Sequence, residues 1–202
     1  DYILGNLGKN NKFKATKEHP FKVYANDFDG NGTNDVVLAK YYKDGYVPMR
    51  GKECTTQQMP YVGEKFKDFH SFASSKLIDI LPEKTVEGAV VYEISTFESI
   101  LLVNENGKLT AQKLPIQAQI SPIKNSFVDD FNKDGFKDIL LVGNHYGVEV
   151  ETVRYDAGYG SILLGDGKNK FKFLPPSSSG FYIPTDSRAI SSIKTINNSK
   201  MY

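Results

Sequence analysis

The feature that most constrains the fold is a nine-residue acidic pattern that occurs twice and is each time followed by an apolar run. The first copy, Asp27–Asp35, precedes Val-Val-Leu-Ala, and the second copy, Asp130–Asp138, precedes Ile-Leu-Leu-Val. Both copies follow the pattern Asp-x-[Asp/Asn]-x-[Asp/Asn]-Gly-x-x-Asp. Because an internal repeat marks a supersecondary unit that is used more than once, the two copies predict two equivalent corners that lead into strands.

Strand patterns account for most of the rest of the chain. Short runs rich in Val, Ile, Leu, Tyr and Phe are bounded by Gly, Asn and Asp, as is typical of strands that end in turns. The chain is therefore predicted to be all-β apart from one insertion. The expected strands are Phe21–Asn26, Asp35–Tyr42, Gly88–Ile94, Ser99–Asn104, Lys108–Leu114, Ser126–Asp129, Asp138–Asn144, Ser161–Gly165, Lys170–Leu174 and Arg188–Ile196.

One stretch departs from the strand pattern. Between Gly63 and Leu81, apolar side chains recur at spacings of three and four residues, which indicates one or two short amphipathic helices. Pro82 is expected to end them, because proline has no N–H and restricts the residue before it. These helices, near residues 60–81, are expected to lie within an insertion over residues 43–87 of a single segment that covers residues 1–202.

A second repeated unit consists of an apolar run, a turn rich in Asn, Gly and Lys, and a returning run, which predicts a β-hairpin. It occurs at Tyr2–Lys14, Ser99–Leu109 and Ser161–Lys172. Hairpins and acidic loops alternate along the chain. This order is expected of a β-propeller whose blades place an acidic loop between the first two strands and a hairpin as the last two.

The chain would then form two complete four-stranded blades and two partial ones, which together amount to about three blades. Closed propellers have about four to eight blades. In addition, the first residues, Asp1-Tyr2-Ile3-Leu4, have the pattern of a strand interior. We therefore expect the chain to be a fragment of a longer protein, with the remaining blades upstream, and the alternative is a ring that stays open.

Composition limits the class of protein. The 202 residues are 40% hydrophobic and 24% charged, which is typical of a globular protein. A net charge of +1 provides no general attraction to nucleic acids or anionic lipids, so no nucleic-acid partner is expected. The lone Cys54 excludes a disulfide within the chain and a cysteine-based zinc site. No apolar run approaches the roughly 20 residues that a membrane span requires.

The acidic pattern has the chemistry of a calcium site, since Ca²⁺ takes about six to eight oxygen ligands. Three carboxylates within nine residues also repel one another unless a cation neutralises them. An EF-hand would need Glu at the twelfth position, where Leu38 and Leu141 stand, so the loops are expected to join strands. The alternative is that these Asp, Asn and Gly residues only form turns. The expected ligands of two Ca²⁺ ions are Asp27, Asp29, Asn31, the Thr33 carbonyl and Asp35, and Asp130, Asn132, Asp134, the Phe136 carbonyl and Asp138.

Both loops resemble those of FG-GAP repeats, also called VCBS-type repeats, which form the blades of integrin-α-like and many bacterial surface β-propellers. Tyr2–Gly8 and Asp130–Asn144 are similar to the terminal repeats of large exported proteins of Bacteroidetes-like bacteria, which carry FG-GAP and ASPIC/UnbV domains. The resemblance covers most of the chain, and Lys43–Glu87 is the clearest departure. It implies a β-propeller, calcium as the metal, and an extracytoplasmic location at the cell surface, in the periplasm or outside the cell.

Enzymatic chemistry lacks a local signature. His19, His70 and His145 are far apart in the sequence and have no metal-ligand spacing. The sequence contains neither a Gly-x-Ser-x-Gly elbow nor a phosphate-binding loop. No catalytic residue is therefore predicted.

Two other groups of residues could bind a partner. Tyr41, Tyr42, Tyr46 and Tyr61 could stack on sugar rings, although packing within the sheet is the alternative. The charged connection Gly147–Gly160 could contact a sugar or a protein, because loops on a rigid scaffold commonly carry binding. The alternative for this connection is a solvated hairpin with internal ion pairs.

Together these features favour a non-enzymatic, calcium-binding, extracytoplasmic β-propeller module for protein or glycan interaction or scaffolding. The alternative function is an accessory or partial domain of a surface polysaccharide-processing enzyme whose catalytic residues lie elsewhere. A cleft with convergent carboxylates would favour the enzyme, and a flat face decorated with loops would favour binding.

Overall fold

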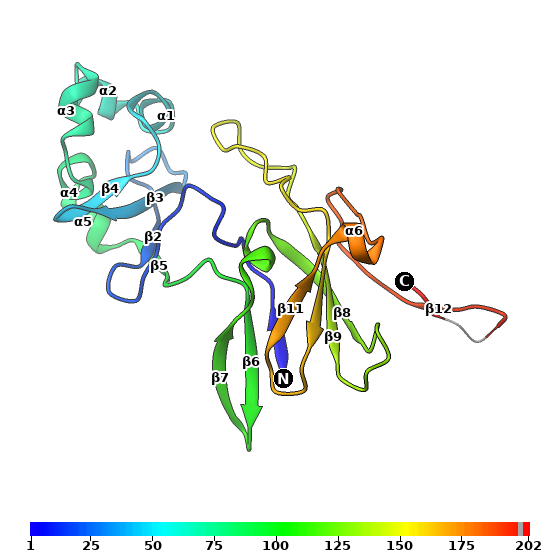
Figure 1. Ribbon diagram of the computed structural model, residues 1–202. Helices are drawn as coiled ribbons and strands as arrows, with labels where there is room; N and C mark the ends of the chain where they lie inside the picture. The colour runs from blue at the N-terminus through cyan, green and yellow to red at the C-terminus, as the bar shows by residue number, and fades with distance from the viewer. Residues whose placement is uncertain (198–199) are drawn as a thin grey trace. The chain divides into compact units, whose positions relative to one another are not determined.

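The computed structural model describes residues 1–197 and 200–202. It divides into two compact units (Figure 1). Unit 1 consists of Asp1–Lys12 and Phe97–Tyr202, and unit 2 consists of Phe13–Thr96. Over the described residues strands outnumber helices, which confirms the predicted predominance of strands, although unit 2 combines its sheet with five short helices.

Unit 2 contains a four-stranded antiparallel sheet in the order β4-β3-β2-β5. The two central strands begin and end at the predicted residues. The strand missed by the sequence pattern is β4, which is only four residues long. The four strands are β2 (Phe21–Asn26), β3 (Asp35–Tyr42), β4 (Gly45–Pro48) and β5 (Val90–Ile94).

Five short helices stand where one or two were predicted. Helix α4 ends before Pro82 as expected, but Pro82 then becomes the N-cap residue of α5, where its missing N–H is not needed. None of the helices in the described residues is long and apolar enough to cross a membrane. The helices are α1 (Lys52–Gln58), α2 (Tyr61–Lys65), α3 (Phe69–Ala73), α4 (Leu77–Ile80) and α5 (Glu83–Glu87).

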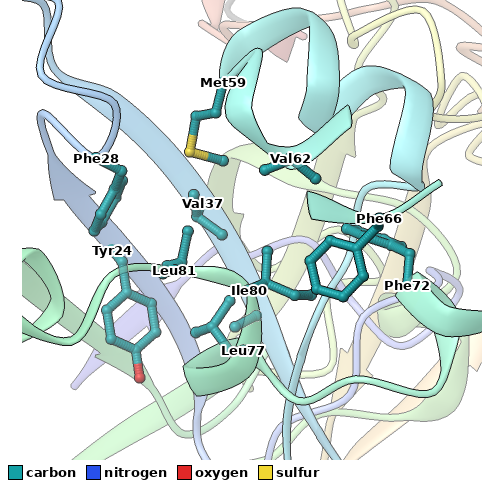
Figure 2. Close-up of a cluster of buried hydrophobic side chains, with 11 residues drawn as sticks. Tyr24, Phe28, Val37, Met59, Val62, Phe66, Phe72, Leu77, Ile80 and Leu81 are labelled. Atoms are coloured by element: carbon teal, nitrogen blue, oxygen red, sulfur yellow. The ribbon is translucent and has the colours of Figure 1, made fainter. Parts of the chain in front are cut away.

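The helices and the sheet of unit 2 share one apolar core (Figure 2). Tyr24 of β2 and Val37 of β3 face side chains from the helices. Leu77 and Ile80, three residues apart on α4, are both 1% exposed, so the spacing that predicts a helix is also the spacing that buries the pair. Met59, just after the polar helix α1, is fully buried, which is why the helical region begins before residue 60.

The two larger antiparallel sheets of unit 1 share an apolar core. One has the order β1-β6-β7, and the other has β8, β9, β10 and β11 as neighbours in chain order. The shared cluster includes Leu101 from the first sheet and Ile139 and Leu163 from the second. The strands are β1 (Tyr2–Leu4), β6 (Ile100–Glu105), β7 (Lys108–Lys113), β8 (Ile123–Asp129), β9 (Asp138–Gly143), β10 (Ser161–Gly165) and β11 (Phe171–Leu174).

Strand β9 is buried on both faces, which explains its continuous apolar run. Leu140 and Val142 belong to a second cluster, on the face opposite Ile139, and this cluster is covered by Phe181 and Ile190 from the C-terminal segment. The remaining short elements are η1 (Ile116–Gln119), α6 (Pro176–Ser179), β12 (Ile193–Lys194) and β13 (Lys200–Met201).

Only the second of the two predicted complete blades has the expected strand arrangement. Its acidic loop joins β8 to β9, and the hairpin β10–β11 supplies the last two strands. The first predicted blade is wrong. Strands β4 and β5 occupy both edges of the sheet that holds the first acidic loop, so the hairpin β6–β7 pairs with β1 instead.

The predicted N-terminal hairpin, Tyr2–Lys14, is also wrong. Only β1 forms, and the chain then crosses to other contacts, where the Gly8 N–H donates to the Phe97 carbonyl and the Lys9 N–H to the Gln119 carbonyl, each at 2.7 Å. Gly8 has a φ of +85°, and a Cβ there would lie 2.5 Å from the Gln119 oxygen. Glycine is therefore needed for this close crossing and not for a hairpin turn.

The predicted strand Arg188–Ile196, the start of a further blade, is present only as β12, which pairs with β13. Ile190 packs instead on the sheet face that contains Leu140. The C-terminal segment thus covers a sheet face and does not extend a sheet edge. The structure contains one sheet with the strand order expected of a blade, not two complete and two partial ones.

An ion pair fastens this C-terminal segment to β8. Lys124 Nζ donates to Asp186 Oδ1 at 2.6 Å, and both side chains are largely shielded from solvent. This bond, assisted by the Tyr146 N–H and by Arg188, lowers the pKa of Asp186 to about 2 from an ordinary value of 3.8. Folding therefore favours the deprotonated carboxylate.

Acid should release this contact. Because the pKa of Asp186 is lower in the folded state, its contribution to stability should be complete above about pH 4 and lost as the pH falls toward 2. We expect Asp186→Asn to reduce the loss of unfolding free energy over this range, measured by urea denaturation at each pH. Lys124→Met should flatten the profile in the same way, and a wild-type profile in both variants would contradict the assignment.

The core of unit 2 offers a matched pair of substitutions on one helix. Leu77 is 1% exposed and the adjacent Ile78 is 71% exposed. Leu77→Ala should lower the free energy of unfolding by about 2–5 kcal/mol, because it leaves a cavity. Ile78→Ala should change it by no more than about 0.5 kcal/mol. Urea denaturation measures both values, and equal losses would show that α4 does not pack in this orientation.

Candidate metal centre

The two acidic loops lie at equivalent junctions. The first joins the antiparallel strands β2 and β3, and the second joins β8 and β9. In both, the residue before the pattern pairs in register with its last aspartate, Asn26 with Asp35 and Asp129 with Asp138. The two sequence repeats therefore connect strands in the same way, although the sheets around them differ.

Both loops bend at the same two positions. The fourth residue has a positive φ in each case, 76° at Gly30 and 63° at Lys133. The sixth residue does so as well, with 86° at Gly32 and 91° at Gly135. Glycine adopts this left-handed conformation without a steric cost, which explains why the sixth position of the pattern is Gly in both copies.

The first aspartate of each loop accepts hydrogen bonds from main-chain N–H groups across the loop. Asp27 Oδ1 accepts from Gly30 at 2.7 Å and from Asn31 at 3.0 Å, and Asp27 Oδ2 accepts from Gly32 at 2.8 Å. The Gly32 bond, with help from the other two, holds the pKa of Asp27 below its usual value. The carboxylate is thus kept charged.

The second loop repeats this arrangement. Asp130 Oδ1 accepts from the Asp134 N–H at 3.1 Å, and Asp130 Oδ2 accepts from the Gly135 N–H at 2.9 Å. These donors stand at the fifth and sixth positions, as Asn31 and Gly32 do in the first loop. The two loops therefore share their main-chain geometry as well as their sequence.

The third and fifth residues also act alike in the two loops. Each places a side-chain oxygen against the N–H two residues further on, which is an Asx turn. The N–H groups of Thr33 and Phe136 take part, whereas the proposed role of their carbonyls as metal ligands stays a prediction. The four bonds are Asn31 N–H to Asp29 (3.1 Å), Thr33 N–H to Asn31 (2.8 Å), Asp134 N–H to Asn132 (3.0 Å) and Phe136 N–H to Asp134 (2.8 Å).

The last aspartate of each loop is buried. Asp35 is 5% exposed and Asp138 is fully buried. Each accepts a bond from the second residue of its own loop, from Phe28 N–H at 3.1 Å and from Phe131 N–H at 2.9 Å. Asp138 accepts a further bond, at 2.9 Å, from the N–H of Gly165 on β10. The last residue of each loop is therefore hydrogen-bonded to the second residue of the same loop.

The first loop brings three predicted ligands together. Asp27, Asp29 and Asp35 each place one carboxylate oxygen within 4.8 Å of the others. Among residues 1–197 and 200–202, no other group of three or more Asp, Glu, His or Cys residues has ligand atoms within this distance of one another. The three carboxylates of the second loop, Asp130, Asp134 and Asp138, are not gathered this closely.

The donor atoms of both loops fit a hard divalent cation. All of the side-chain donors are carboxylate or amide oxygens, which Ca²⁺ prefers, and none is the sulfur or imidazole nitrogen that structural zinc sites use. Main-chain N–H groups also bond to several of these oxygens. The metal-binding role of the ten residues stays a prediction.

The sequence pattern missed one position of the loop. Asn26 and Asp129, directly before the two copies, each accept a bond from the first aspartate's N–H, at 2.9 and 3.0 Å. Asp129 is also bonded to Lys200 and Tyr202, and the Lys200 ammonium contributes most to lowering its pKa to about 2. An Asp or Asn before both copies is the signal that could have identified this position.

Three of the four tyrosines considered for sugar stacking pack within unit 2. Tyr41 stacks on His19 with ring centroids 3.7 Å apart, and Tyr46 meets the edge of Tyr41 at 5.6 Å. Burial raises the pKa of Tyr61 to about 12. Tyr42 alone among the four is exposed, at 55%.

The connection Gly147–Gly160 contains the internal ion pair that its alternative interpretation predicts. Arg154 Nε donates to Asp156 Oδ2 at 3.2 Å. The base of the connection is held by the buried Asn144, whose side chain donates to the Gly158 carbonyl at 2.7 Å and accepts from the Gly158 N–H at 2.8 Å. A role of this connection in binding stays a prediction.

No protein-family model matches the chain, and neither a curated protein nor a solved structure is significantly similar to it. The resemblance to FG-GAP and VCBS-type repeats therefore rests on the two loops and the strands that flank them. It stays a prediction.

In the metal-free protein, the buried carboxylate of the second loop should contribute more to the free energy of unfolding than an exposed one. Asp138→Ala leaves the Phe131 and Gly165 N–H groups without their acceptor and should cost about 1–3 kcal/mol of unfolding free energy for each. Asp134→Ala, at an exposed position, should cost less than about 1 kcal/mol. Urea denaturation in the presence of a chelator measures both, and a larger loss for Asp134→Ala would contradict the geometry.

Proposed function

We propose that this chain is a calcium-binding, non-enzymatic β-propeller module of an extracytoplasmic protein, in which it binds or scaffolds a protein or glycan partner. The observation that carries the proposal is the equivalence of the two acidic loops. They share a sequence pattern, a junction between antiparallel strands, two left-handed residues and a set of main-chain hydrogen bonds.

Calcium would act in these loops as a brace. The Asp27, Asp29 and Asp35 oxygens lie within 4.8 Å of one another, and a divalent cation would relieve their repulsion. Extracellular modules bind Ca²⁺ with a Kd of about 10⁻⁴–10⁻³ M. At millimolar calcium each site would then add about 0.5–1.5 kcal/mol to stability. A contribution of this size suits a structural ion in a calcium-rich compartment more than a sensitive switch.

The sheet β8–β11 supports the propeller part of the proposal. Its four strands follow one another in chain order, as in a propeller blade, and its central strand β9 is buried on both faces. A blade inside a ring is likewise covered on both faces by its neighbours. The remaining blades would come from a longer parent chain.

The binding part of the proposal rests on the connections between strands. Gly147–Gly160 is a long connection anchored at its base by the buried Asn144, and it carries Arg154 and Asp156 on an exposed surface. Loops held by a rigid sheet in this way commonly contact partners.

Calorimetric titration of the metal-free protein with Ca²⁺ tests the proposal. We expect binding at two sites, with one lost in Asp27→Ala, the other in Asp130→Ala, and both in the double variant. Asp29→Asn should weaken the first site, since it removes a charge but keeps an oxygen that can accept the Asn31 N–H.

Asp166→Ala is the matched control for this titration. Asp166 also accepts main-chain N–H bonds, from Lys168 and Lys170, but it lies outside the acidic pattern. The control should retain both sites. An unchanged heat of calcium binding in the Asp27→Ala, Asp130→Ala double variant would rule out the proposed metal sites.

A further inference from the structure

Unit 2 has a pocket of about 380 Å³ beside its edge strand β4. The lining combines residues from β3, from β4 and the segment that follows it, from the first residue of α1, and from α3 and the segment after it. All of these residues belong to unit 2, and none belongs to either acidic loop. The pocket is therefore separate from the candidate metal centre.

The charge of this lining is one-sided. Lys40, Arg50 and Lys52 line the pocket, and the described lining residues include no Asp or Glu. The whole chain has a net charge of only +1, so three cations around one pocket are a local concentration of positive charge. An anion bound in the pocket would be attracted to these cations. The lining thus favours an anionic ligand.

Aromatic rings also line the pocket. Tyr42 is 55% exposed and Phe69 is 62% exposed, whereas Phe72 is buried and joins the pocket to the core. Lys40 Nζ lies 5.9 Å from the centre of the Tyr42 ring, and Lys52 Nζ lies 5.5 Å from the centre of the Phe69 ring. A ligand that used the whole lining would need both an anionic group and an apolar face.

We propose that this pocket binds an acidic saccharide, specifically a hexuronate unit of a carboxylated glycan. The carboxylate would pair with the lysines and with Arg50, and the apolar face of the sugar ring would pack on Tyr42 or Phe69. The volume falls within the range of about 300–1,000 Å³ typical of small-ligand sites. This inference rests on the proposed function only in that both make the chain a binding module.

Calorimetry with trigalacturonate as the probe, and with the neutral maltotriose beside it, tests the inference. The protein should bind trigalacturonate at least about tenfold more tightly than maltotriose, because only the former offers carboxylates to the cations. Lys40→Gln combined with Lys52→Gln should weaken trigalacturonate binding about tenfold or more. Affinity should also fall between about 0.05 and 0.5 M salt, since screening shortens the reach of the charges.

Lys65→Gln combined with Lys67→Gln is the matched control, because it removes the same charge from residues that do not line the pocket. It should leave binding unchanged. Phe69→Ala should weaken the binding of both sugars. This variant therefore separates the contribution of ring packing from that of charge. The melting temperature of every variant, followed by circular dichroism, shows that loss of binding is not loss of fold.

Three outcomes would overturn the inference: no heat with trigalacturonate, equal weakening in the control, or tighter binding of a hexaglutamate peptide than of trigalacturonate. The last would assign the pocket to an acidic protein segment. Repeating the titration with the Asp27→Ala, Asp130→Ala variant keeps the two proposals apart. Binding of trigalacturonate should persist there whether or not the wild-type protein binds calcium.

Discussion

Two buried carboxylates, those of Asp35 and Asp138, fix the corners on which both main sheets depend. Each accepts an N–H from the second residue of its own loop, so the strand that follows the loop determines how the loop starts. Hydrogen bonds of this kind are worth more in a buried setting than at the surface, because the N–H would otherwise lose its bond to water without compensation. Each corner therefore has hydrogen bonds of its own that link its first and last residues. A cation bound by the same carboxylates would add to these bonds.

The parts of the fold that could be predicted are those that depend on neighbouring residues. Strands β2, β3 and β10 begin and end as predicted, because alternation or a short apolar run lies between clear turn residues. The hairpins β6–β7 and β10–β11 follow from the same local signals. The candidate metal ligands could be predicted from the sequence for the same reason, because all five side chains or carbonyls of each predicted ion site lie within nine residues.

What could not be predicted depends on contacts between distant segments. The pairing of β5 with β2, and of β1 with β6, is not encoded in any local period. Helix α1 has a polar sequence and owes its place to packing around it. The cationic pocket shows the same limit, because Lys40, Lys52 and Phe69 come from three segments, and only the fold brings them together. The sequence pattern indicated the nearby tyrosines as possible sugar-binding residues, but it gave no reason to single out Lys40 or Lys52.

Unit 1 is interrupted in the sequence by the whole of unit 2. Strand β1 pairs with β6, Tyr2 facing Leu102, so this pairing cannot form until the entire intervening unit has been synthesised. Unit 2, by contrast, is continuous and includes both edges of its own sheet. On a ribosome, which releases the chain from its N-terminal side, unit 2 could collapse before β6 is available to β1. The β1–β6 pairing would then close around a unit that has already folded.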